Sequence, residues 1–145
     1  IYMQDRYYAP AIKEFQMAVL LDPNTQASSV YYANLANCYM KIGYPALAQD
    51  TLQRAIKLNP MNFGLYQDLA VVYKRLGIGS QKIKTYKKES EKNPLAQVMV
   101  GMILMEQGKT DEGLAKLQEF AYTEPDLIIT KGVQKYIDEH TKEKF

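Results

Sequence analysis

The stretch YANLANCYMKIGYPALAQDTLQRAIKLNP, residues 32–60, decides the fold. It contains two groups of small and apolar residues spaced three and four apart, which places each group on one face of an α-helix. The first group is Tyr32, Leu35, Ala36 and Tyr39, and the second is Ala48, Leu52, Ala55 and Ile56. Pro60 follows the second group, where it stops a helix. The stretch therefore predicts two helices joined by a short turn.

The same punctuation recurs along the chain. An acidic or amide residue directly precedes Pro23, Pro60, Pro94 and Pro125, and the prolines lie 37, 34 and 31 residues apart. An amphipathic stretch runs up to each proline. Recurrence at intervals of this length is the signature of a helical repeat, in which each helix pair buries its apolar face against its neighbours.

Glycines and further prolines predict the turns inside each pair. Gly43, Gly77 and Gly108 come just after the first helices, where a left-handed C-cap favours glycine. Pro10 and Pro45 stand at the expected first turn of second helices, where the missing N–H is not needed. No stretch alternates with period two, so we expect no strands.

The pattern resembles the tetratricopeptide (TPR) family, a 34-residue helix–turn–helix repeat. The second repeat fills the eight signature positions, which are Tyr32, Leu35, Ala36, Tyr39, Ala48, Leu52, Ala55 and Pro60. The third repeat has Lys82 and Glu89 where the family has small residues. We therefore expect the second helix of that repeat to pack less closely or in a shifted register.

The resemblance implies an all-α fold, a right-handed superhelical α-solenoid of antiparallel helix pairs. It predicts a single domain over residues 1–145, with repeats at 1–25 (partial), 29–60, 62–94 and 95–125. A closing helix over residues 126–140 is expected, with Asp126 as its cap and Val133 and Ile137 on its apolar face. Because the first repeat is incomplete, the chain is expected to be a fragment of a longer protein.

Composition and side-chain chemistry exclude several function classes. The 18 basic and 16 acidic side chains leave a net charge of only +2, too little for a dedicated nucleic-acid binder. One cysteine, Cys38, and one histidine, His140, cannot form a metal cluster, and Cys38 is expected to be a small packing residue. The lysines between Lys82 and Lys92 are diluted by glutamates and are expected to form a solvated face. We predict no cofactor, no metal and no catalytic activity.

The TPR resemblance implies a concave groove lined by the first helices. The positions carried over from the family are Asn34, Asn37, Met40, Lys41, Gln67, Val71, Lys74, Arg75, Val98, Met102 and Met105. Asn34 stands where clamp-type TPR co-chaperones grip the terminal carboxylate of heat-shock chaperones. Gln67 and Val71 replace the basic residues of that clamp, so carboxylate capture is not expected.

The sequence thus predicts a scaffold that binds a partner peptide or helix in its groove. The alternative is an assembly element of a larger protein, with the incomplete N-terminal end joining a second copy. No apolar run approaches the length of a membrane span. A cytoplasmic location is expected, although a targeting or anchor segment upstream would change it.

Overall fold

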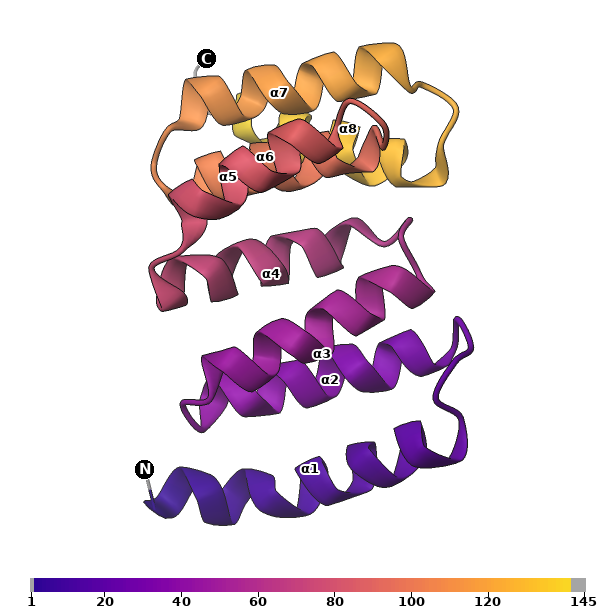
Figure 1. The fold of residues 1–145 in the computed structure, drawn as a ribbon, viewed down its shortest axis with the longest axis vertical. Helices are drawn as coiled ribbons and strands as arrows, with labels where there is room; N and C mark the ends of the chain where they lie inside the picture. The colour runs from indigo at the N-terminus through magenta and orange to yellow at the C-terminus, as the bar shows by residue number, and fades with distance from the viewer. Residues whose placement is uncertain (1, 142–145) are drawn as a thin grey trace. The chain divides into compact units, whose positions relative to one another are not determined.

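The computed structural model describes the backbone of residues 2–141 and the side chains of residues 7–141 (Figure 1). In that range the chain has helices and no strand, as predicted, and it divides into two compact units, Ile1–Pro60 and Met61–Phe145. The first unit contains α1 (Tyr2–Leu21), α2 (Ser28–Lys41) and α3 (Pro45–Leu58). The second contains α4 (Phe63–Leu76), α5 (Gly79–Glu89), α6 (Leu95–Glu106), α7 (Thr110–Thr123) and α8 (Ile128–Thr141). The all-α class is confirmed, while the single domain stays a prediction.

In the first unit, α2 and α3 form the helix pair predicted from residues 32–60. The small residues of the pattern lie where the two helices meet, and Ala36, Ala48 and Ala55 are at most 1% exposed. Side chains this short let two helix backbones approach closely, so that the neighbouring leucines interdigitate. Pro45 occupies the first turn of α3, as predicted.

The prediction for Pro10 was wrong. Proline was expected to start a helix there, but α1 is a continuous helix from Tyr2 to Leu21 with Pro10 inside it. A proline inside a helix removes one backbone hydrogen bond without always ending the helix. The residues that follow Pro10 keep the apolar spacing, and packing against α2 favours continuation of the helix.

In the second unit, α6 and α7 approach even more closely, through glycines. A Cβ atom added to Gly113 would lie 2.9 Å from the backbone oxygen of Gly101, and one added to Gly101 would lie 2.7 Å from Leu117 Cδ2. Leu117 and Phe120 are fully buried beside this contact. The fourth repeat is therefore closed by backbone proximity rather than by alanine side chains.

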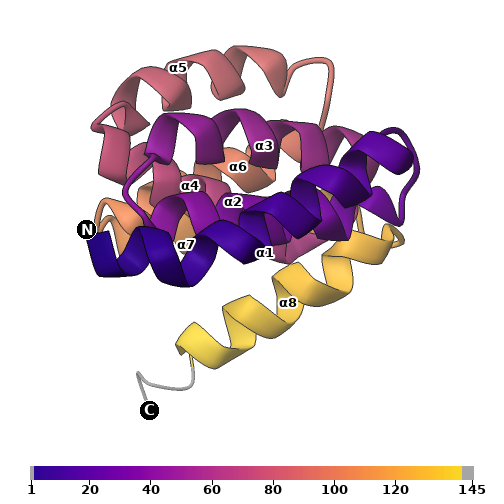
Figure 2. The same cartoon turned by 90° about the horizontal axis from the view of Figure 1, so that it is seen from below.

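The third repeat departs from this arrangement, as its sequence predicts. α5 packs mainly against α6 and makes few contacts with α4, and it lies at one edge of the unit (Figure 2). Lys82 occupies a position where the family has a small residue, and its Nζ lies 5.5 Å from the centre of the Tyr73 ring. The Tyr73 and Tyr86 hydroxyl groups join the two helices by a 2.7 Å hydrogen bond. A polar and aromatic contact thus replaces the close approach of small residues.

The closing helix is present as α8. Ile129, Val133 and Ile137 are buried along one face, as predicted. The helix begins at Ile128, so Asp126 lies too far upstream to be its N-cap, and that detail of the prediction was wrong. The Thr130 hydroxyl instead donates a hydrogen bond to the Glu124 carbonyl and ties the first turn of α8 to the end of α7.

The turns inside the helix pairs follow the glycine pattern. Gly43, Gly77 and Gly108 have φ angles of +88°, +71° and +80°, in the left-handed region that glycine adopts most easily. Gly77 is the C-cap of α4, and its N–H donates to the Lys74 carbonyl. The predicted left-handed glycines are thus confirmed at all three turns, although the C-caps of α2 and α6 are Ile42 and Gln107, one residue before Gly43 and Gly108.

The buried tyrosines of the third repeat predict instability in alkali. Burial, aided by the Glu89 carboxylate, raises the pKa of Tyr66 to about 12, and burial and the Tyr73 hydrogen bond raise the pKa of Tyr86 well above its ordinary value. The unfolded chain loses these protons from about pH 10 while the folded chain keeps them, so the free energy of unfolding should fall as pH rises above 10.

Tyr86→Phe should make that fall shallower, because one of the titrating hydroxyl groups is gone, and should cost about 1 kcal/mol at neutral pH through the lost hydrogen bond. Urea titrations of both proteins between pH 7 and 11.5 would measure the two effects. An identical slope in the variant and the parent would contradict the account.

Candidate functional site

The outer face of α4 is the most accessible part of the predicted groove in the second unit. Gln67, Val71, Lys74 and Arg75, here called the α4 strip, lie opposite the buried stripe of that helix. Val71 is 44% exposed, Lys74 and Arg75 are exposed, and Gln67 is half-buried. Asp68 lies beside them, and partial burial raises the pKa of its carboxyl group. The strip therefore combines an apolar centre with an amide on one side and two cations on the other.

The position of α4 is fixed at both ends. The Asn62 side chain accepts a 3.0 Å hydrogen bond from the Gly64 N–H and caps the helix start. Gly77 ends the helix, and Lys74 and Arg75 lie in its last turn, where the helix dipole favours positive charge. The two cations thus have a structural reason to be there as well as a functional one.

A cleft of about 610 Å³ lies where the C-terminal ends of α4 and α6 meet the start of α5. Lys74 and Met105, two of the predicted site residues, both line it. Ser80, Glu106 and Gln107 supply polar groups at its wall, and the Gln107 amide nitrogen donates to the Ser80 hydroxyl over 3.1 Å. The structure therefore brings one predicted cation and one predicted methionine together beside the strip.

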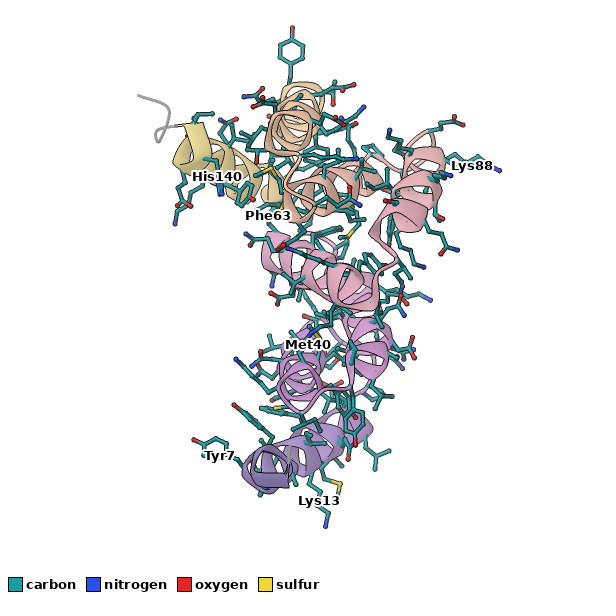
Figure 3. The ribbon with its side chains drawn as sticks, turned by 90° about the vertical axis from the view of Figure 1, so that its left-hand side faces the viewer. Tyr7, Lys13, Met40, Phe63, Lys88 and His140 are labelled. Carbon is teal, nitrogen blue, oxygen red and sulfur yellow. The ribbon has the colours of Figure 1, made fainter. Side chains whose placement is uncertain are left out.

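A second cleft, of about 420 Å³, separates the first half of α4 from α8. Gln67 lines it together with Lys135 and Glu139 of α8. The rings of Phe63 and Tyr136 meet edge to face at its floor, with centres 5.4 Å apart, and Figure 3 shows Phe63 beside the helix that carries His140. The closing helix thus forms one wall of the site, which the sequence did not indicate.

Two predicted site residues, Val98 and Met102, belong to the core instead. They are 0% and 3% exposed, so neither side chain can touch a partner while the unit is folded. Their helix, α6, packs against α4, α5 and α7. Tyr136 of α8 also comes close enough for the charge of Glu106 to contribute to its raised pKa, after burial. Helices therefore surround α6, and Met105 at its end is the only one of its three predicted residues that is part-exposed.

The remaining predicted residues lie on α2 in the first unit. Asn34, Asn37 and Lys41 are exposed, and Met40 is half-buried. Sequence reasoning missed Val30 and Tyr31 on the same helix, which are 54% and 39% exposed. Because large apolar side chains are usually covered, their position next to the asparagines was the available signal.

Comparisons with known proteins agree with the helical-repeat fold. Residues 30–62 match the family described as Tetratricopeptide repeat. These residues thus form a tetratricopeptide repeat. No curated protein matches its sequence significantly.

Solved structures share the fold of this chain. One described as MamA protein is 27% identical, with 86% of this chain and 68% of that chain covered and a TM-score of 0.51. A second MamA structure is 18% identical, with coverage of 97% and 95% and a TM-score of 0.52. A thermophilic TPR protein of Thermus thermophilus is 19% identical, with coverage of 90% and 71% and a TM-score of 0.51.

Tetratricopeptide repeats such as the one matched by residues 30–62 typically form non-catalytic protein–protein interaction scaffolds. Cys38 is 5% exposed, and burial raises the pKa of its thiol, which disfavours the reactive thiolate. Among the described side chains, those of residues 7–141, no group of acidic, cysteine or histidine residues could hold a metal ion. In the same range no helix is long and apolar enough to cross a membrane.

Because Met102 on α6 is buried and Val71 on α4 is exposed, a glutamate should destabilise the unit strongly at the first position and little at the second. Met102→Glu should destabilise the second unit by about 3 kcal/mol or more, because the carboxylate would be buried without a partner. Val71→Glu should change the free energy of unfolding by less than about 1 kcal/mol, because the side chain is 44% exposed. Chemical unfolding followed by circular dichroism measures both values, and equal destabilisation would contradict this assignment of core and surface.

Proposed function

We propose that the TPR scaffold binds a partner peptide or helix along the exposed faces of its first helices, with the α4 strip as the main contact in the second unit. The observation that carries the proposal is the exposure of Val71 between an amide and two cations on one helix face. An isolated exposed valine is ordinary. A valine flanked by side chains that can bind a backbone and a carboxylate forms a small recognition surface.

The chemistry of the strip favours an amphipathic segment with acidic residues. Val71 offers apolar contact, and the neighbouring cleft, part-lined by Met105, can accept a leucine-sized side chain of the partner. Lys74 and Arg75 attract carboxylates, which fix orientation and speed association more than they increase affinity. Binding should therefore weaken moderately as salt rises.

The exposed face of α2 is the corresponding surface of the first unit. Asn34 and Asn37 can each donate and accept hydrogen bonds with a peptide backbone, and Lys41 adds a cation at the end of the helix. Val30 and Tyr31 supply apolar area at its start. The two faces share the same combination of apolar, amide and basic groups, so both suit the same class of ligand.

Capture of partners from the native source tests this function. Val71→Glu should reduce the amount of captured partner about tenfold or more, because it puts a charge at the apolar centre. Tyr122→Glu is the matched control, since Tyr122 is a large residue on α7 that is 87% exposed and lines neither cleft, and it should leave capture unchanged.

The contribution of the cations is tested by the rate at which the captured partner associates with alanine variants. Lys74→Ala should mainly slow association, by about twofold to fivefold at low salt, whereas Lys88→Ala on α5 should not. Figure 3 shows Lys88 pointing away from the unit. Unchanged capture by Val71→Glu, or equal losses in the two alanine variants, would exclude the α4 strip as the binding site.

A further inference from the structure

Positive charge is concentrated in one short segment of the chain. Residues 74–92 contain seven of the 18 basic side chains and two of the 16 acidic ones, which gives this segment a net charge of +5. The other 126 residues carry 11 basic and 14 acidic side chains, and therefore a net charge of −3. An asymmetry of this kind indicates a surface that meets a negatively charged partner.

Helix α5 separates the charged residues of this segment onto two sides. Lys82 lies on the side that faces α4, because its Nζ is 5.5 Å from the centre of the Tyr73 ring. Glu89 lies on the same side, since its carboxylate adds to the effect of burial in raising the pKa of Tyr66 to about 12. Glu89 is therefore turned away from the lysines on the opposite side of α5.

The opposite side of α5 carries three exposed lysines. Lys84, Lys87 and Lys88 stand at intervals of three and four residues, which places them side by side on the helix surface. Lys92 follows four residues after Lys88 and is also exposed. We call these four residues the α5 basic face. Glu91 is the one acidic residue at this end, so the face and Glu91 together have a net charge of +3.

The fold explains only part of this face. Lys87 and Lys88 lie in the last turn of α5, where the helix dipole favours positive charge. Lys84 lies in the middle of the helix, where the dipole gives no such advantage, and lysines three and four residues apart repel one another. A cluster that slightly destabilises its own helix is better explained by a partner.

The chemistry of α5 favours a membrane surface over a nucleic acid. Four cations on one helix neutralise only a few phosphates of a duplex. Single strands stack on exposed aromatic rings, but Tyr86, the aromatic residue of α5, is half-buried and its hydroxyl is hydrogen-bonded to Tyr73 over 2.7 Å. Anionic lipids can gather under lysines of any spacing, and each lysine near the surface strengthens binding about fivefold.

We propose that the α5 basic face binds the protein reversibly to a bilayer that contains anionic lipids. The helix lies at one edge of its unit (Figure 2), and Lys88 points away from the unit (Figure 3). Ile83 and Tyr86, its large apolar residues, are buried and half-buried, so no such side chain is exposed for insertion into the bilayer. The attachment is therefore electrostatic and weakens steeply as salt rises.

This surface is separate from the α4 strip. Tyr73, which joins α4 to α5, and Val71 of the strip are two residues apart and therefore point to different sides of α4. Membrane binding by α5 is thus independent of the peptide binding proposed for α4.

Sedimentation of the whole chain with lipid vesicles tests the proposal. Vesicles of phosphatidylcholine with about 30% phosphatidylserine should carry the chain down at about 50 mM salt, and vesicles of phosphatidylcholine alone should not. Raising the salt to about 300 mM should release the bound chain.

Lysine variants locate the membrane-binding surface. Replacing Lys84, Lys87 and Lys88 together by glutamine should lower the partition coefficient about a hundredfold, and glutamine keeps the helix because its helix propensity is close to that of lysine. The matched control removes the same charge from exposed positions on three other helices, by replacing Lys13, Lys57 and Lys131 with glutamine. It should change the partition coefficient less than about threefold.

A gain of binding gives a further check. Gln81 is exposed and stands three residues before Lys84, so Gln81→Lys extends the basic face by one residue. It should raise the partition coefficient about fivefold. Val71→Glu should not release the chain from the vesicles, which separates this surface from the α4 strip.

Three results would overturn the proposal. The first is equal loss of vesicle binding in the two triple variants, and the second is equal binding to vesicles with and without phosphatidylserine. The third is displacement of the chain from the vesicles by a short RNA duplex at the same total phosphate concentration, which would make a nucleic acid the preferred ligand of the face.

Discussion

Close approach of paired helices at small residues is the constraint on which the rest of the structure depends. Where alanine or glycine stands at the crossing, as at Ala48 and Gly113, the pair closes and the neighbouring large side chains become buried. Close packing of this kind gains many dispersion contacts for each helix turn. A helix face is closed where its small residue meets a neighbouring helix. A face without such a contact stays open to a partner.

The third repeat shows what happens when the constraint is not met. Lys82 and Glu89 are too large and too polar for the crossing, so α5 packs mainly on α6 and reaches α4 through the pair Tyr73 and Tyr86. The same change exposes the cleft beside Lys74 where α4, α5 and α6 meet. A departure from the repeat pattern therefore shapes one of the two clefts at the candidate site.

Much of the fold could be predicted from the sequence, because proline, glycine and small-residue spacing act locally: Gly43, Pro45 and Ala48 each lie where their residue type predicts. The residues of the candidate binding site were harder to predict. Family positions identified Val71 and Lys74 as groove residues, but Val98 and Met102 are buried because helices surround α6. The unbroken apolar run from Val98 to Leu104 was the missed signal, since a helix that is apolar all round is a core helix.

Oxidative footprinting of the methionines tests most directly the claim that helix pairing decides which faces are open. Met17 on α1 is 59% exposed, whereas Met99 and Met102 on α6 are 1% and 3% exposed. Hydroxyl radicals followed by mass spectrometry should oxidise Met17 at least about tenfold faster than either methionine of α6, because oxidation follows exposure. Oxidation of Met102 at the rate of Met17 in the folded chain would show that α6 is not the closed centre of its unit, and would contradict the account.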